Sequence, residues 1–220
     1  MRIVPTGNQP FELEFSKGVV YFEPILDLEP VIPPGEEALT QGIGSKERLL
    51  GLLAGRRAAK RALAALGFSR WPLPWVAGGG VFWPPGVVGA VSHKGAWACA
   101  AALRRGPKGL GLDLEDLAAK HNPAILSKVA TAEEIQRFAL QGFGAKELAL
   151  FSAKEAIFKA VNPYLRQWFG FHQAQAIELN EDRIHFELAS SLVALGAPKV
   201  IEVELYSVGE MKLACSVWGG

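Results

Sequence analysis

Residues Gly109–Leu117 read GLGLDLEDL, a stretch in which leucines alternate with glycines and carboxylates. Such alternation indicates a β-strand, because successive side chains of a strand point to opposite faces. Asp113 and Glu115 would then project from one face, about 7 Å apart along the strand. Two like charges held side by side repel each other and do not stabilise a sheet. We therefore expect either a positive group between them or a strand end that lies in solvent.

The composition of the 220-residue chain is that of an ordinary globular protein, with 50% hydrophobic and 20% charged residues. The net charge of +1 provides neither a basic field for nucleic acid nor an acidic tail. The longest apolar run, Ala96–Leu103, is far shorter than a membrane span, and the first residues lack the layout of a signal peptide. Cys99 and Cys215 are too few for a zinc site or a disulfide framework. We expect a soluble, cytoplasmic protein without a nucleic-acid partner or a membrane span.

Two long helices and several strand patterns organise the chain. The first helix has Ser45 as a candidate N-cap and Gly67 as a candidate stop. The second is expected over Ala145–Val161, because Asn162-Pro163 disfavours its continuation. Strand patterns cover 87–93 and 96–103, joined by a tight turn, then 109–115 and four alternating stretches within 174–218 that look like an antiparallel meander. The order predicts an α+β protein with two similar halves, 1–107 and 108–220.

Glu155, within FSAKEAIFKA (residues 151–160), is a third candidate beside Asp113 and Glu115 for a carboxylate site. Mg²⁺ prefers oxygen ligands and is usually held by one or two carboxylates together with substrate phosphates. Structural interpretations compete with this one. A D-x-E sequence at a strand end is often solvent-exposed charge, Ser152 and Glu155 have the spacing of a capping box, and Glu155 and Lys159 would form a favourable i,i+4 pair.

Several side chains could hold an anion through charge and hydrogen bonds. They are Ser92, His93 and Lys94 at a strand end, Arg56 and Lys60 on one face of the first helix, and Lys154 and Lys159 on either side of Glu155. Each group taken alone could equally be solvated surface. Neither a Walker A motif, a dinucleotide-binding fingerprint nor the G-x-S-x-G signature of hydrolases is present.

In combination these motifs resemble those of the 4′-phosphopantetheinyl transferases, of the monomeric surfactin type and its enterobactin-synthase-component branch. The resemblance is carried by VFWPPGVVGAVSHKGAWACAAA (81–102), GLDLE (111–115) and FSAKEAIFKA (151–160), with GRRAAKRAL (55–63) upstream. Ala90 stands where the family has a small hydroxyl residue, and Lys94 where Cys or Thr is common. Neither departure removes a candidate ligand.

The resemblance implies Mg²⁺-dependent transfer of the 4′-phosphopantetheine group of coenzyme A to a serine of an acyl or peptidyl carrier protein, releasing adenosine 3′,5′-bisphosphate. It implies an α+β fold of two pseudo-symmetric halves, each a small, mostly antiparallel sheet with a long helix, with coenzyme A between them and a monomer as the working unit. The residues it implies are Asp113, Glu115 and Glu155 for Mg²⁺, Glu155 and Lys159 for catalysis, and Arg48, Arg56, Ser92, His93, Lys154 and Lys159 for coenzyme A.

Two other classes of function stay open from the sequence. A Mg²⁺-dependent hydrolase of nucleotides or phosphoesters could use the same carboxylates and lysines. A non-catalytic relative could bind coenzyme A without transferring its arm. Only transfer depends on a carrier-protein acceptor.

Overall fold

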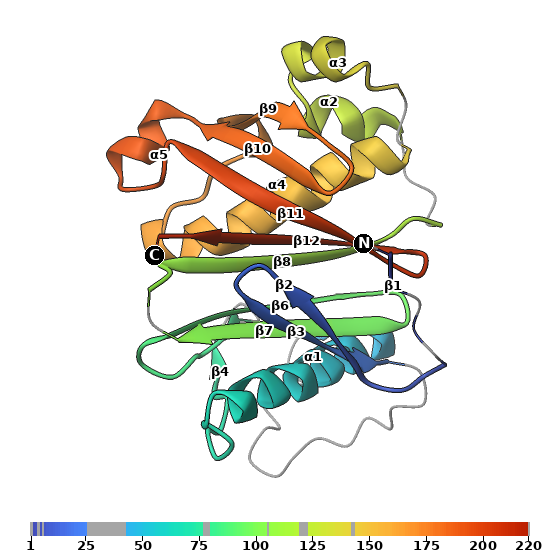
Figure 1. Cartoon of the computed structure of the whole chain (residues 1–220), viewed down its shortest axis with the longest axis vertical. Coiled ribbons are helices and arrows are strands. Elements are labelled where there is room, and N and C mark those ends of the chain that lie inside the picture. The colour runs from blue at the N-terminus through green and yellow to red at the C-terminus, as the bar shows by residue number, and fades with distance from the viewer. Residues whose placement is uncertain are drawn as a thin grey trace. The chain divides into compact units, whose positions relative to one another are not determined.

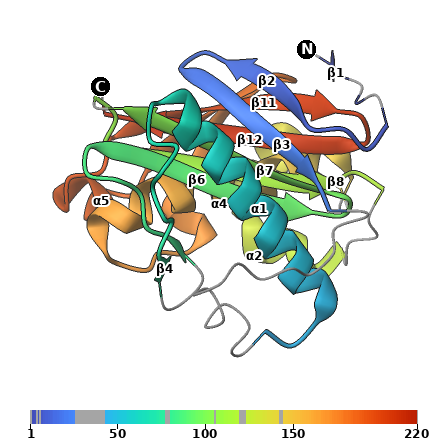
Figure 2. The same ribbon diagram turned by 90° about the horizontal axis from the view of Figure 1, so that it is seen from below.

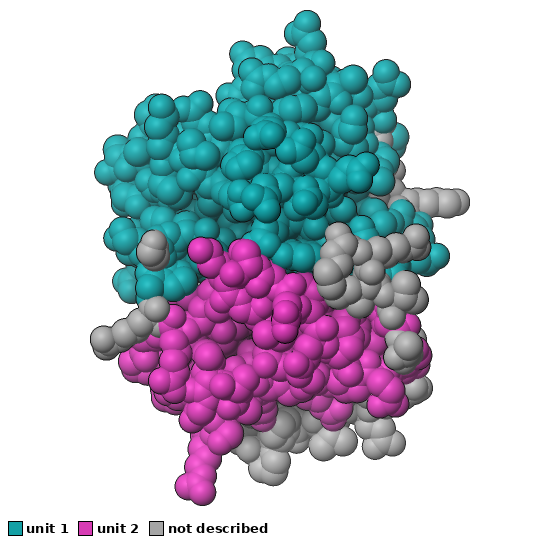
Figure 3. All heavy atoms as spheres, in the orientation of Figure 1, with its two compact units in different colours: residues 1–4, 106–220 teal, residues 5–105 magenta. Residues whose placement is uncertain are grey.

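The computed structural model describes residues 2–3, 5, 7–25, 43–76, 80–104, 106–118, 123–141 and 144–219. The chain divides into two compact units, which Figure 3 colours separately. Unit 1 comprises residues 106–220 together with residues 1–4, and unit 2 comprises residues 5–105. Each unit combines a mostly antiparallel sheet with one long helix, so the predicted α+β class is confirmed.

Unit 2 contains a four-stranded antiparallel sheet covered by one helix. Its strand order is β2 (Phe11–Phe15), β3 (Gly18–Pro24), β7 (Trp97–Arg104) and β6 (Val87–Lys94). Strands β6 and β7 form the hairpin that the sequence predicted. Helix α1 (Lys46–Ala65) lies across β3, β6 and β7, as Figure 2 shows. A short ladder of β4 (Trp75–Val76) and β5 (Gly80–Val81) completes the unit.

Helix α1 begins as its sequence predicts and packs closely against β6. The hydroxyl of Ser45 accepts a hydrogen bond from the backbone N–H of Arg48 at 3.2 Å, which caps the first turn. A Cβ atom at Gly55 would lie 2.6 Å from Cγ1 of Val91 on β6. The absence of a side chain there lets the helix and the strand approach each other.

Unit 1 contains the larger sheet, drawn with its helices in Figure 1. Neighbouring strands are antiparallel in the order β8 (Gly109–Asp116), β12 (Met211–Trp218), β11 (Val200–Val208), β10 (Arg183–Leu188) and β9 (Ala174–Leu179). The last four are the predicted meander. Helix α4 (Ala145–Leu165) packs against β8, β12 and β11. The remaining elements are η2 (Pro123–Ile125), α2 (Leu126–Val129), α3 (Ala132–Phe138), η3 (Phe171–Gln173) and α5 (Ser190–Ala194).

The fold differs from the sequence-based expectations at strand β1 and at the end of helix α4. Strand β1 (Arg2–Ile3) pairs in parallel with β11, so the first residues belong to the sheet of unit 1 rather than to the N-terminal half. Helix α4 continues through Pro163 to Leu165 instead of stopping before it. Proline costs the helix one hydrogen bond at this point, but Arg166 closes the last turn in a left-handed conformation (φ 53°), and its N–H donates to the carbonyl of Asn162 at 2.7 Å.

The core of unit 1 lies between α4 and the inner face of its sheet. Its fully buried members include Leu150 and Ile157 from α4 and Phe186 and Val203 from the sheet. This packing fixes the rotation of α4 about its own axis, and so decides which of its polar side chains face β8. Among the residues that the structure describes, no helix combines the length and the apolar character that a membrane crossing needs.

Candidate active site

Strand β8 lies very close to α4 because two glycines face the helix. A Cβ atom at Gly111 would lie 1.8 Å from the carbonyl oxygen of Ala156, and one at Gly109 would lie 1.9 Å from that of Ala160. The indole Nε1 of Trp218 donates to the same Ala160 oxygen at 3.0 Å. Since side chains alternate along a strand, Asp113 also faces α4, as does Glu115. The glycines of GLGLDLED therefore bring the helix to the carboxylates.

Both carboxylates are buried, with 5% of Asp113 and 7% of Glu115 exposed. The expectation of a strand end in solvent is therefore wrong. The expected positive group is present: Nζ of Lys159 lies 2.7 Å from Oδ1 of Asp113. The hydroxyl of Ser152 donates to the backbone carbonyl of Asp113 at 3.2 Å, which fixes the helix to the strand at this level.

Glu155 lies on α4 between Ser152 and Lys159 and is half-buried. Burial is the largest cause that raises the pKa of its carboxyl; the charges of Asp113 and Glu115 raise it further, while Lys159 lowers it. The three acidic side chains are therefore within electrostatic reach of one another. The capping-box interpretation of Ser152 and Glu155 is wrong, because α4 begins at Ala145, about two turns earlier.

The three carboxylates offer the ligand atoms that Mg²⁺ prefers, but in the structure they do not surround one common point. Within the described part of the chain, no three or more His, Cys, Asp and Glu side chains form a metal-binding group. Asp113 directs Oδ1 to the ammonium of Lys159 instead. All three candidates, Asp113, Glu115 and Glu155, supply the hard oxygen ligands that Mg²⁺ prefers, and their mutual repulsion is the kind that a divalent cation relieves. The residues present fit this ion.

Lys154 does not point to the carboxylate site, where its predicted contact with a pyrophosphate would lie. Its side chain is fully buried, and Nζ donates to Oε2 of Glu134 at 2.8 Å and to the carbonyl oxygen of Val129 at 2.9 Å. Burial lowers the pKa of this ammonium, and Glu134 opposes that effect through its charge and its hydrogen bond. Of the two lysines that flank Glu155 in the sequence, only Lys159 contacts the carboxylate site.

A groove of about 700 Å³ opens beside Glu155. We call it the aromatic groove, because Phe158, Trp168, Phe169 and Phe171 line it. The other lining residues are Lys128, Lys154, Gly170, His172, Gln173 and Ala174. Trp168 leaves 77% of its surface exposed, which is unusual for so large an apolar side chain. The sequence analysis did not predict this groove, although the run WFGF (168–171) supplies three of its aromatic side chains.

In unit 2, the imidazole of His93 lies against α1. A Cβ atom at Gly51 would lie 2.6 Å from Nδ1 of His93, so the glycine makes room for the ring. Arg48 is exposed one turn before Gly51, and residues three apart share a helix face. Arg48 and Gly51 therefore share the helix face that the imidazole of His93 approaches.

Two further predicted contacts with coenzyme A are buried in unit 2. Arg56 is only 5% exposed, and its Nη2 donates to the carbonyl of Leu73 at 2.7 Å. The alternative of a solvated basic face is therefore wrong for Arg56, which supports the segment around Leu73, while its contact with coenzyme A stays a prediction. Ser92 is also buried and alternates with His93 on β6, so the two do not share one face.

Comparison with known proteins connects both units to one family. A family model described as "4′-phosphopantetheinyl transferase superfamily" matches residues 109–211, and one described as "4′-phosphopantetheinyl transferase N-terminal domain" matches residues 37–103. Enterobactin synthase component D of Escherichia coli O157:H7 is 33% identical over 147 residues, which cover 65% of this chain and 68% of that relative. The chain belongs to the 4′-phosphopantetheinyl transferase superfamily.

Two more relatives in this superfamily carry related descriptions. Enterobactin synthase component D of Salmonella typhi is 28% identical over 166 residues, 74% of this chain. The 4′-phosphopantetheinyl transferase Npt of Nocardia iowensis is 32% identical over 143 residues, 64% of this chain. The chain spans 65% of the Salmonella relative and 64% of the Nocardia relative, somewhat less than two thirds of either length.

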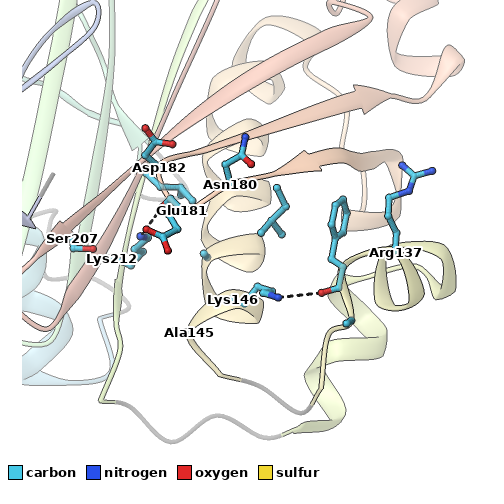
Figure 4. A pocket seen from close by; sticks show the side chains of 13 residues that line it. Arg137, Ala145, Lys146, Asn180, Glu181, Asp182, Ser207 and Lys212 are labelled. Atoms are coloured by element: carbon cyan, nitrogen blue, oxygen red, sulfur yellow. Dashed lines mark hydrogen bonds between the residues drawn. The ribbon is translucent and has the colours of Figure 1, made fainter.

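Unit 1 also contains a cavity that is larger than the aromatic groove. It measures about 1210 Å³ and contains side chains of both charges, among them Arg137, Lys146, Asp182 and Lys212 (Figure 4). Nζ of Lys146 donates to the carbonyl of Phe138 at 3.2 Å. None of the sequence-predicted site residues lines this cavity. Size alone therefore does not identify the functional site, and the smaller groove is the one that includes Glu155.

Proposed function

We propose that this protein transfers the 4′-phosphopantetheine group of coenzyme A to a serine hydroxyl of an acyl or peptidyl carrier protein. The serine oxygen forms a bond to the phosphorus that carries pantetheine, the bridging P–O bond of the pyrophosphate breaks, and adenosine 3′,5′-bisphosphate leaves. The observation that carries the proposal is the meeting of Asp113, Glu155 and Lys159 across β8 and α4. Family membership supports the same reaction.

The proposed roles follow from the charges and contacts of these side chains. Glu155 accepts the proton of the attacking serine, because it is the carboxylate of this site that also lines the aromatic groove. An ammonium has three N–H donors, so Lys159 can contact Asp113 and an oxygen of the pyrophosphate at the same time. Asp113, Glu115 and Glu155 would hold Mg²⁺, whose chemistry here is neutralisation of charge on the pyrophosphate.

The direct test of the proposed function is mass spectrometry of apo carrier proteins after incubation with the enzyme, coenzyme A and Mg²⁺. We expect the mass gain of one phosphopantetheine group and an equal amount of adenosine 3′,5′-bisphosphate. Incubation without a carrier separates the alternative, because a phosphoester hydrolase would release bisphosphate steadily in its absence. Binding of coenzyme A with neither product would indicate a non-catalytic relative.

The same proposal covers the carrier that accepts the group, the cellular location and the oligomeric state. Two of the relatives described above are named as components of enterobactin synthase, so a carrier in siderophore or other secondary-metabolite synthesis is one candidate acceptor. Cys99 and Cys215 are both buried thiols, which agrees with a cytoplasmic location. One chain contains both the carboxylates of unit 1 and the candidate phosphate contacts of unit 2, so we propose that a monomer suffices.

Replacing Trp168 by alanine should raise the KM for coenzyme A about tenfold. We propose that the aromatic groove receives the pantetheine arm, whose apolar segments would cover the exposed indole, and burial of such a side chain stabilises by about 1.5–3 kcal/mol. Thermal stability should be nearly unchanged, because Trp168 is largely exposed. Leu195→Ala is the matched control, an exposed apolar residue of unit 1 outside the groove. An unchanged KM in the Trp168 variant would exclude this use of the groove.

Replacing His93 by alanine should remove much of the preference for coenzyme A over 3′-dephospho-coenzyme A. We propose that His93 and Arg48 bind the 3′-phosphate, and a hydrogen bond to a charged group contributes about 1.5–3 kcal/mol, or roughly ten- to a hundredfold in affinity. The shorter ligand lacks that phosphate, so its affinity should hardly change. Isothermal titration with both ligands measures the effect, and Arg70→Ala, an exposed arginine of unit 2, is the control. Equal weakening of both ligands would contradict the assignment.

A further inference from the structure

Lys154 and Glu134 form an ion pair in which neither side chain exposes any surface. The carboxylate of Glu134 accepts three hydrogen bonds. Its Oε2 accepts from Lys154 Nζ at 2.8 Å and from the backbone N–H of Thr131 at 2.8 Å, and its Oε1 accepts from the backbone N–H of Ala176 at 2.7 Å. Its own N–H donates to the hydroxyl of Thr131 at 3.2 Å, which completes the capping box of α3.

This pair joins four elements of unit 1. Thr131 and Glu134 belong to the start of α3, Lys154 to α4 and Ala176 to β9, while Lys154 also donates to the carbonyl of Val129 at the end of α2. A buried charge whose partners come from several elements restrains all of them, since moving any one would leave a charged group without its partner in a nonpolar interior.

Three of these four elements, α2, α4 and β9, also line the aromatic groove. Lys128 comes from α2, Glu155 and Phe158 come from α4, and Gln173 and Ala174 lie where η3 passes into β9. Lys154 directly precedes Glu155 on α4. Because the Lys154 ammonium is bonded inside unit 1, it fixes the helix turn that places Glu155 in the groove.

We propose that Lys154 and Glu134 are positioning residues for the transfer reaction, and that Lys154 acts through its buried partners, Glu134 and the carbonyl of Val129, and not by touching the substrate. This inference rests on the proposed function of Glu155. The alternative is a direct contact between Lys154 and the pyrophosphate. That contact would require Lys154 to leave Glu134 and Val129, and the carboxylate of Glu134 would then stay buried without its counter-charge.

The test combines Lys154→Met, Glu134→Gln and the double variant. Lys154→Met should lower the Tm by about 10 °C, because it leaves a buried carboxylate without a counter-ion. Measured well below that Tm, its kcat should fall about tenfold or more, with the KM and Kd for coenzyme A within about twofold of wild type. The double variant should regain at least half of the loss in Tm and in kcat, because the buried charge is gone and glutamine also serves in a capping box.

The decisive comparison is between Glu134→Gln and the double variant. It does not require that the single variant Lys154→Met folds. Adding Lys154→Met to Glu134→Gln should leave the Kd for coenzyme A within about twofold, because the proposal gives Lys154 no contact with that ligand. A direct phosphate contact predicts a loss of coenzyme A affinity of roughly tenfold or more in both backgrounds, and that result would overturn the proposal. Lys146→Met, on the exposed side of the same helix, is the control and should leave both Tm and kcat near wild type.

A failure of the proposed function is distinguishable from a failure of this inference. If wild-type protein modifies no carrier, the transferase assignment fails, and the positioning role falls with it. The Tm values of the four proteins would still show whether the two residues are coupled. If wild type is active but the double variant is as impaired as Lys154→Met, the positioning role alone is wrong.

Discussion

Asp113→Asn should abolish carrier modification, with a loss in kcat of about 10²–10³-fold or more, the scale typical of removing one electrostatic contact that acts on the transition state. The variant removes one of the three carboxylates proposed to hold Mg²⁺ and the partner that orients Lys159 at 2.7 Å. Chelation of divalent cations should abolish transfer by the wild-type protein as well. Product formation followed by mass spectrometry measures both effects.

Stability separates this loss of activity from unfolding. Asp113→Asn breaks an ion pair but also relieves the repulsion among the carboxylates, and the partly exposed ammonium of Lys159 can be hydrated instead. The free energy of unfolding should therefore change by no more than about 1 kcal/mol. Asp182→Asn, an exposed carboxylate of the same unit, is the control for charge removal. Full transfer activity in Asp113→Asn would contradict the metal assignment.

Gly111→Ala should destabilise unit 1 by about 3 kcal/mol or more, at the upper end of the range for overpacked cores. Its new Cβ would lie 1.8 Å from the carbonyl oxygen of Ala156, a backbone atom that cannot turn away as a side chain could. Helix α4 must then move off β8, which separates Glu155 and Lys159 from Asp113. We expect a decrease in Tm of about 6–12 °C and a loss of transfer even at temperatures where the protein stays folded.

The control for Gly111→Ala is Gly44→Ala, because an added Cβ at Gly44 meets no atom within 4 Å. That variant should keep the wild-type Tm within about 1–2 °C, since surface substitutions usually change stability by less than about 0.5 kcal/mol. If Gly111→Ala behaved like Gly44→Ala, the close approach of β8 and α4 would not be needed for folding, and the explanation of the glycines in GLGLDLED would be wrong.

Local rules predicted most elements of the fold. Ser45 caps α1, strands β6 and β7 form the predicted hairpin, and the alternating tail forms the meander of β9 to β12. These features depend on a few neighbouring residues, whose spacing is visible in the sequence. The end of α4 was misjudged, because proline disfavours a helix locally while the packing of its last turn depends on the rest of the unit.

The sequence by itself determined the family and the residue types of the candidate site, because three segments in a fixed order carry them: residues 81–102, GLDLE (111–115) and FSAKEAIFKA (151–160). The alternation in GLGLDLE also placed Asp113 and Glu115 on one strand face. Only the tertiary structure decided which neighbours these residues meet. The ammonium of Lys159 contacts Asp113, whereas the ammonium of Lys154 is buried against Glu134, although the two lysines are five positions apart on one helix. Positions five apart point about 140° apart around an α-helix, and packing of α4 against the sheet decides which side faces β8 and which faces α3.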